Sequence, residues 1–103
     1  MGSSEPRLTA QTLKVLGAVM SPMHEEMSGA EIGRSTSLAS GTLYPILFRL
    51  EEAGWLSSRW EVGDPSELGR PRRRLYRITG VGARKAKSAF REVLKPLKEF
   101  AWS

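Results

Sequence analysis

The side chains with the clearest chemistry are four arginines within five positions: Arg70, Arg72, Arg73 and Arg74. A guanidinium group donates paired hydrogen bonds to phosphate oxygens, so such a cluster suits a polyanion. Between residues 70 and 91 the chain has nine Lys or Arg and no Asp or Glu, whereas residues 1–50 hold four basic and four acidic residues. The net charge of +5 is therefore concentrated in the second half. This distribution predicts a surface that binds DNA, and the alternative is a basic surface that serves only solubility.

A second group of polar residues lies on a helix predicted over residues 40–53. Thr42 and Arg49 are seven positions apart and share one side of this helix, clear of its leucine-rich stripe. A short polar group and a long donor placed in this way suit the base edges of the major groove. For Arg49 the alternative is an ion pair with Glu52, three residues further on. Ser40 and the backbone amides near Gly41 would donate to a phosphate at the start of the helix.

Three further residues are candidates for contact with DNA, and two of them have an alternative role within the fold. The Tyr44 hydroxyl either bonds a phosphate or is the exposed tip of a partly buried ring. Phe48 lies opposite the apolar stripe, where it either meets a thymine methyl group or packs against the hairpin that follows. Ser28, at the start of the preceding helix, is predicted as a second phosphate site.

The elements that position these residues follow from periodicity and capping. Apolar residues at helical spacing predict helices over residues 9–20, 28–34 and 40–53, with Thr9 and a Ser28–Glu31 capping box at the first two starts. Gly54 is the expected residue after the third helix. Period-two alternation within residues 57–79, around a glycine- and proline-rich tip, predicts a two-stranded hairpin.

This order predicts a mainly α member of the α+β class, a winged helix-turn-helix with three helices and a basic wing. Residues 1–7 are expected to be a flexible terminus and residues 8–79 the DNA-binding domain. Residues 80–103 are expected to form a dimerisation helix, because apolar residues recur there at alternating spacings of three and four. The residues predicted at a dimer interface are Leu13, Leu16, Ala86, Phe90, Val93, Leu97 and Phe100. The alternative is packing of this helix on the first helix of the same chain, and Pro96 is expected to kink it.

Composition argues against several other classes. The absence of cysteine and the single histidine, His24, give no thiolate or His-based metal site and fit a reducing cytoplasm. No apolar run is long enough for a membrane span. There is no His pair, no phosphate-cradling glycine loop and no carboxylate pair set against a base, so we expect neither an enzyme nor a cofactor.

Two long motifs resemble one protein family. The motifs are Gly-Thr-Leu-Tyr-Pro-Ile-Leu-x-Arg-Leu-Glu-x-x-Gly-Trp-Leu, from Gly41, and Gly-Arg-Pro-Arg-Arg-Arg-x-Tyr-Arg-Ile-Thr-x-x-Gly, from Gly69. Together they closely resemble the PadR family of bacterial transcriptional regulators over residues 8–90. The short segment after Thr79 resembles the compact branch of the family, which has a single C-terminal helix.

The resemblance implies a homodimeric repressor that binds an inverted-repeat operator. It also implies that Thr42 and Tyr44 lie in the DNA-reading region, and that Gly69 and the arginines after it form the wing tip. Relatives in this branch respond to small aromatic compounds held between the subunits, a space that Phe90, Phe100 and Trp102 would line here; core packing is the alternative for Phe90. The alternative functions are a protein-interaction module and a small-molecule-binding protein.

Overall fold

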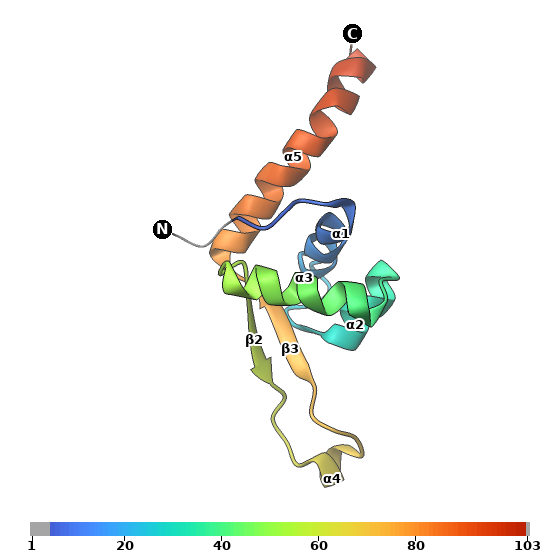
Figure 1. The fold of residues 1–103 in the computed structure, drawn as a ribbon, viewed down its shortest axis with the longest axis vertical. Helices are drawn as coiled ribbons and strands as arrows, with labels where there is room; N and C mark the ends of the chain where they lie inside the picture. The colour runs from blue at the N-terminus through green and yellow to red at the C-terminus, as the bar shows by residue number, and fades with distance from the viewer. Residues whose placement is uncertain (1–4, 103) are drawn as a thin grey trace.

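The computed structural model describes residues 5–102 of the chain, with side chains described as far as residue 95. In this part of the chain the elements are α1 (Ala10–Val19), β1 (Met27–Ser28), α2 (Gly29–Thr36), α3 (Ser40–Glu52), β2 (Leu56–Trp60), α4 (Pro65–Leu68), β3 (Arg74–Ile78) and α5 (Gly80–Trp102). The first three helices pack together, the β2–β3 hairpin projects from one side of them, and α5 extends away on the other side (Figure 1). The winged helix-turn-helix predicted from the sequence is confirmed.

Local capping sets the starts of the first two helices, as predicted. The Thr9 hydroxyl accepts a hydrogen bond from the Thr12 amide at 3.2 Å at the start of α1. At the start of α2, Ser28 and Glu31 form a complete capping box, with bonds of 3.0 and 3.1 Å. Each cap satisfies backbone donors that the first turn of a helix leaves unpaired.

The buried face of α3 is the centre of the core. Its buried residues are Leu43, Ile46, Leu47 and Leu50. Gly54 follows the helix with a φ of +80°, a conformation that glycine adopts readily. Its amide donates to the Glu51 carbonyl at 3.0 Å and the next amide, of Trp55, donates to Leu50 at 2.9 Å. This turn ends α3 and leads directly into β2.

The sheet has three strands, in the order β1-β3-β2, rather than the two predicted. The additional strand, β1, pairs antiparallel with β3 through Met27 opposite Tyr76 and Ser28 opposite Leu75. From the sequence Met27 is expected in a loop, because two residues are too few for a period-two pattern. The pairing fixes the start of α2 to the base of the wing.

The first half of α5 packs on its own chain, which corrects part of the predicted dimer interface. Leu16 of α1 and Ala86 of α5 are both 0% exposed within a single chain, so neither can contact a partner. Phe90 packs partly buried against the same core, the alternative that the sequence left open. The heptad spacing does mark an apolar seam, but its first turns face α1 rather than a second subunit.

Beyond Phe90 the helix leaves the core. Val93 and Leu94 are exposed, at 53% and 46%, and Leu13 of α1 is half-buried. The helix continues through Pro96, where the sequence predicts a kink. The side chains of Leu97, Phe100 and Trp102, predicted at the interface or in a ligand space, lie outside the described residues. Within residues 5–102, none of the helices combines the length and apolarity that crossing a membrane requires.

Candidate nucleic-acid interface

The outer face of α3 displays most of the residues predicted to read DNA. Ser40, Gly41, Thr42, Tyr44 and Arg49 are all exposed. The N-cap residue of α3, Ala39, has no side chain that can accept from the first amides, in contrast to the caps of α1 and α2. The first turn therefore leaves backbone donors pointing outward, as a phosphate contact requires.

Neither the packing nor the backbone conformation of the chain requires glycine at position 41. A Cβ atom built on it would meet nothing within 4 Å, and its φ is not in the left-handed region. Glycine within a helix costs about 1 kcal/mol relative to alanine. A bare backbone at this exposed position instead suits the close approach of another molecule.

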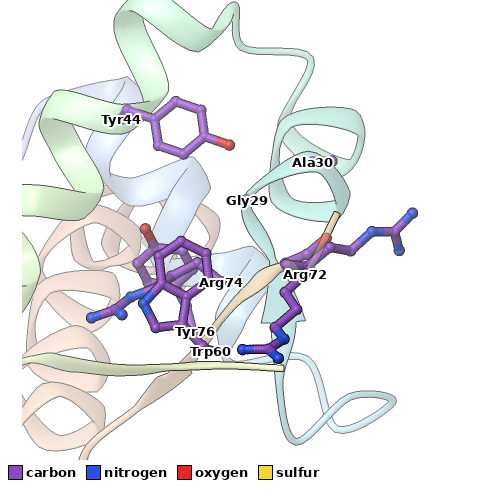
Figure 2. A pocket seen from close by; sticks show the side chains of 9 residues that line it. Gly29, Ala30, Tyr44, Trp60, Arg72, Arg74 and Tyr76 are labelled. Atoms are coloured by element: carbon purple, nitrogen blue, oxygen red, sulfur yellow. The ribbon is translucent and has the colours of Figure 1, made fainter. Parts of the chain in front are cut away.

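Tyr44 joins α3 to the start of α2. The ring is 46% exposed, and its hydroxyl reaches so far toward Gly29 that a Cβ there would lie 2.5 Å from the hydroxyl oxygen. Figure 2 shows this hydroxyl pointing at the first turn of α2. The sequence alternatives for Tyr44 are thus combined: the ring is partly covered and its polar tip lies beside a helix start.

Ser28 does not offer the exposed hydroxyl that the sequence predicts. Its side chain is 2% exposed and already accepts the Glu31 amide in the capping box. The physical reason is that the same serine belongs to β1, whose pairing with β3 buries it. We therefore remove Ser28 from the predicted contacts, while the neighbouring exposed Ala30 keeps the helix start accessible.

The four wing arginines divide into two pairs with different surroundings. Arg70 is held by Glu61 through two hydrogen bonds of 2.6 and 2.9 Å, so its charge is neutralised within the wing. Arg74 donates to Ser58 at 2.9 Å and lies 5.1 Å from the centre of the Trp60 ring. Both arginines shape the hairpin, which reduces their value as free phosphate contacts.

Arg72 and Arg73 are both exposed and keep their charges available. Arg72 donates at 2.6 Å to a backbone carbonyl, that of Gly63, which orients the guanidinium without neutralising it. Arg73 uses its backbone amide, which donates to Glu61 at 3.3 Å. Within the described residues, no salt bridge holds either side chain.

An open pocket of about 490 Å³ lies between α2, α3 and the wing (Figure 2). Its lining residues are Ser28, Gly29, Ala30, Tyr44, Trp60, Arg72, Arg73, Arg74 and Tyr76. Three arginines, three aromatic residues and the start of α2 thus border one space, and no acidic residue is among these lining residues. The charge and donors of the pocket suit an anion such as a backbone phosphate.

Two members of this arrangement could not be recognised from the sequence. Period-two alternation puts Trp60 on the same strand face as Leu56, yet it is 59% exposed because the hairpin extends beyond the core. Glu61 has no predicted partner among the arginines. A single acidic residue opposite a basic strand could have indicated an ion pair, but only the folded hairpin shows that Glu61 pairs with Arg70.

The pKa of Glu61 offers a test of the wing's internal ion pair. Hydrogen bonds from Arg70, and then from the Arg73 amide, lower this pKa from 4.5 to about 2. Because the folded pKa is lowered, the contribution of the pair to wing order is complete above about pH 4.5 and is lost as the pH falls toward 2. A carboxyl titration followed by NMR is expected to give a midpoint of about 2 for Glu61. In Arg70→Ala the midpoint is expected to rise; a midpoint unchanged by that substitution would contradict the assignment.

The helix-turn-helix, the exposed face of α3 and the basic wing together define a winged-helix DNA-binding protein. The profile of the transcriptional regulator PadR-like family matches residues 18–88, most of the chain, and the chain belongs to this family. The family comprises transcriptional regulators rather than enzymes. A comparison with curated proteins found no significant match.

Solved structures support the fold. A PadR family transcriptional regulator from Eggerthella lenta is 24% identical, with a TM-score of 0.69 over 87% of this chain and 77% of that one. A PadR family regulator from Clostridium difficile is 21% identical, with a TM-score of 0.68 over 90% and 99%. Bacillus subtilis PadR, solved in complex with operator DNA, is 17% identical, with a TM-score of 0.65 over 80% of this chain and 48% of that one. This chain therefore matches about half of the Bacillus protein.

Proposed function

We propose that the chain is a cytoplasmic homodimeric repressor that binds an inverted-repeat operator and is released by a small aromatic effector. Arg72 and Arg73, which line the pocket, carry this proposal, because they present positive charge, outside any salt bridge of the described residues, beside the start of α2 and Tyr44 of α3. In this arrangement α3 enters the major groove and the wing follows the phosphate backbone. The complex of the Bacillus relative with operator DNA supports a DNA-binding role for this fold.

The proposal assigns the reading of bases to Thr42 and Arg49. Both side chains are exposed on one flank of α3, and neither belongs to its buried face. Ser40, Gly41 and Tyr44 are assigned to phosphates, together with Arg72 and Arg73. Arg70 and Arg74 are assigned to the wing itself, which supports the others indirectly.

Dimerisation is assigned to the outer part of α5. Val93 and Leu94 are exposed apolar residues on a helix that projects from the domain, and a second copy would cover them (Figure 1). A twofold dimer places two α3 helices in symmetric positions and therefore requires an inverted repeat. The DNA-binding domain thus consists of residues 8–79 and the first turns of α5, which pack on them. The later turns of α5 join the subunits. An aromatic effector between the subunits would lie near Phe90.

Selection of DNA from a random pool tests this function directly. The chain is expected to enrich an inverted repeat and to bind it as a dimer, as measured by light scattering of the complex. Enrichment of a single asymmetric half-site, or of no sequence, would contradict the dimeric repressor. Binding of a panel of small aromatic compounds, followed by loss of operator binding, tests the effector.

Thr42→Ala is expected to reduce the preference for operator over unrelated DNA by about tenfold, because the alanine side chain cannot hydrogen-bond a base edge. Binding to unrelated DNA is expected to stay the same, since Thr42 is not assigned to a phosphate. Both affinities are measured by fluorescence anisotropy at one salt concentration. An equal loss of affinity for the two DNAs would exclude Thr42 as a base-reading residue.

Val93→Asp combined with Leu94→Asp is expected to weaken dimerisation by about 100-fold, because a dimer would then bury carboxylates in its apolar contact. Analytical ultracentrifugation over a concentration series measures the change. Val81→Asp is the matched control, since Val81 is an exposed apolar residue in the first turn of the same helix. A double variant that dimerises as well as this control would place the interface elsewhere.

A further inference from the structure

The exposed face of α3 opposite its buried leucines is apolar in its first turns, and the exposed Glu52 follows on the same face one turn after Phe48. Gly41, Pro45 and Phe48 follow one another at spacings of four and three, so they lie on one face of the helix, opposite its buried leucines. Phe48 is 64% exposed, and Pro45 is exposed beside it. A helix face that meets only water is normally polar. The exposed ring of Phe48 therefore suits a partner that offers an apolar group.

The fold itself does not use Phe48. The buried residues of α3 are its leucines and Ile46, and Phe48 is not part of the core cluster. The space between α3 and the wing is lined by Tyr44 and Trp60 rather than by Phe48. Packing against the wing, one of the two uses that the sequence left open, is therefore not what the structure shows.

The surroundings of Phe48 indicate which partner covers it. Arg49 is adjacent on the helix, and the exposed charges of Arg72 and Arg73 lie on the neighbouring wing. These arginines outnumber the single exposed acid on this face, Glu52, and apolar residues beside them match duplex DNA, where the major groove presents negative phosphates at its edges and one apolar group on its floor. That group is the C5 methyl of thymine. Against any other base, the ring would cover polar edge atoms without offering them a hydrogen bond.

We propose that Phe48, with Pro45 beside it, reads thymine methyl groups in the operator, an inference that rests on the proposed DNA-binding function. Residues 41–48 span about 10 Å along the helix axis, which corresponds to about three base pairs. Each half-site is therefore expected to contain a thymine within the three base pairs that face the middle of α3. Phe48 is thus a specificity-determining residue, and Thr42 and Arg49 read the positions beside it.

The test removes single methyl groups from the DNA. Once the pool selection has given an operator, each thymine of one half-site is replaced in turn by deoxyuridine, which pairs identically but lacks the C5 methyl. Binding of the full chain is expected to weaken about fivefold at one or two positions. Phe48→Ala is expected to bind the unmodified operator more weakly and to lose this methyl dependence. Phe48→Leu, which keeps an apolar contact, is expected to retain most of it.

Glu52→Ala is the matched control, because Glu52 is exposed one turn further along α3. This variant is expected to keep the full response to deoxyuridine. Thermal unfolding of all variants checks that the fold is intact, as the exposure of both side chains leads us to expect. Light scattering of Phe48→Ala checks that the free protein keeps its oligomeric state.

Several results would overturn the inference, and they differ from a failure of the proposed function. Equal methyl dependence in the full chain and in Phe48→Ala would assign the effect to DNA shape. Insensitivity of the full chain at every thymine, or a changed oligomeric state in Phe48→Ala, would also exclude the role. In each of these cases the chain still binds its operator. If the pool yields no preferred sequence, the proposed function fails and the inference fails with it.

Discussion

Replacing Arg72 and Arg73 together by alanine is expected to weaken binding to DNA of every sequence by about 100-fold for each bound subunit near 0.1 M salt, roughly tenfold for each phosphate contact. Both side chains are exposed, and no salt bridge within the described residues neutralises them. Because phosphates are the same in all sequences, operator and unrelated DNA are expected to lose affinity equally. The ratio between the two affinities should therefore stay constant.

The dependence on salt gives this prediction a second readout. Removing one phosphate-binding side chain is expected to lower the slope of log affinity against log salt by about one, hence by about two for each subunit of the double variant and by about four for the bound dimer. Fluorescence anisotropy at several salt concentrations measures this slope. Arg91→Ala with Lys95→Ala removes the same charge from exposed positions of α5 and is expected to leave the slope close to that of the unchanged protein. Equal slopes in the wing variant and in this control would remove the wing from the interface.

Gly82→Ala is expected to destabilise the fold by about 3 kcal/mol, the largest effect on stability that we foresee for one added methyl group. A Cβ atom at this position would lie 2.1 Å from the Trp55 carbonyl oxygen and 2.8 Å from its carbon. The clashing atoms belong to the backbone of Trp55, and hydrogen bonds hold this backbone in place. The same carbonyl oxygen accepts the Thr79 amide at 2.9 Å, and the Thr79 hydroxyl in turn accepts the Gly82 amide at 3.0 Å.

Chemical denaturation with urea, and the melting temperature, measure this destabilisation. A change of about 3 kcal/mol corresponds to a fall of about 15 °C for a domain of this size. Gly80→Ala is the matched control two residues earlier, where the nearest heavy atom to an added Cβ is a flexible arginine end 3.7 Å away. This control is expected to raise stability by up to about 1 kcal/mol, because alanine is the better helix former. Similar stabilities in the two variants would contradict the docking of α5 against Trp55.

The parts of the fold that could be predicted are those set by neighbours in the sequence. Caps at Thr9 and Ser28, and the glycine after α3, act within four residues, so composition and spacing are enough to identify them. The same holds for the buried stripe of α3, whose period is a property of the helix alone. The strand β1 could not be found in this way, because its two residues become a strand only by pairing with β3, far along the chain.

The errors in the site have the same origin. A heptad pattern shows that a helix has an apolar seam but not which surface covers it, so it predicts a partner subunit for Ala86 although α1 and the core of the same chain bury this residue. The sequence does not show which of the four neighbouring arginines pair with acidic residues. Glu61 pairs with Arg70 only when the hairpin folds. Ser28 is predicted to face outward because its role in the sheet depends on the distant β3.

The measurement that tests the central claim most directly is footprinting of the chain on the DNA upstream of its own gene, at several salt concentrations. We predict a protected inverted repeat, bound by a dimer through two copies of α3 and its wing. Protection should persist at salt concentrations that remove binding to unrelated DNA. Weak binding that salt alone controls, with no protected sequence, would contradict this prediction and leave only a basic domain without a reading function.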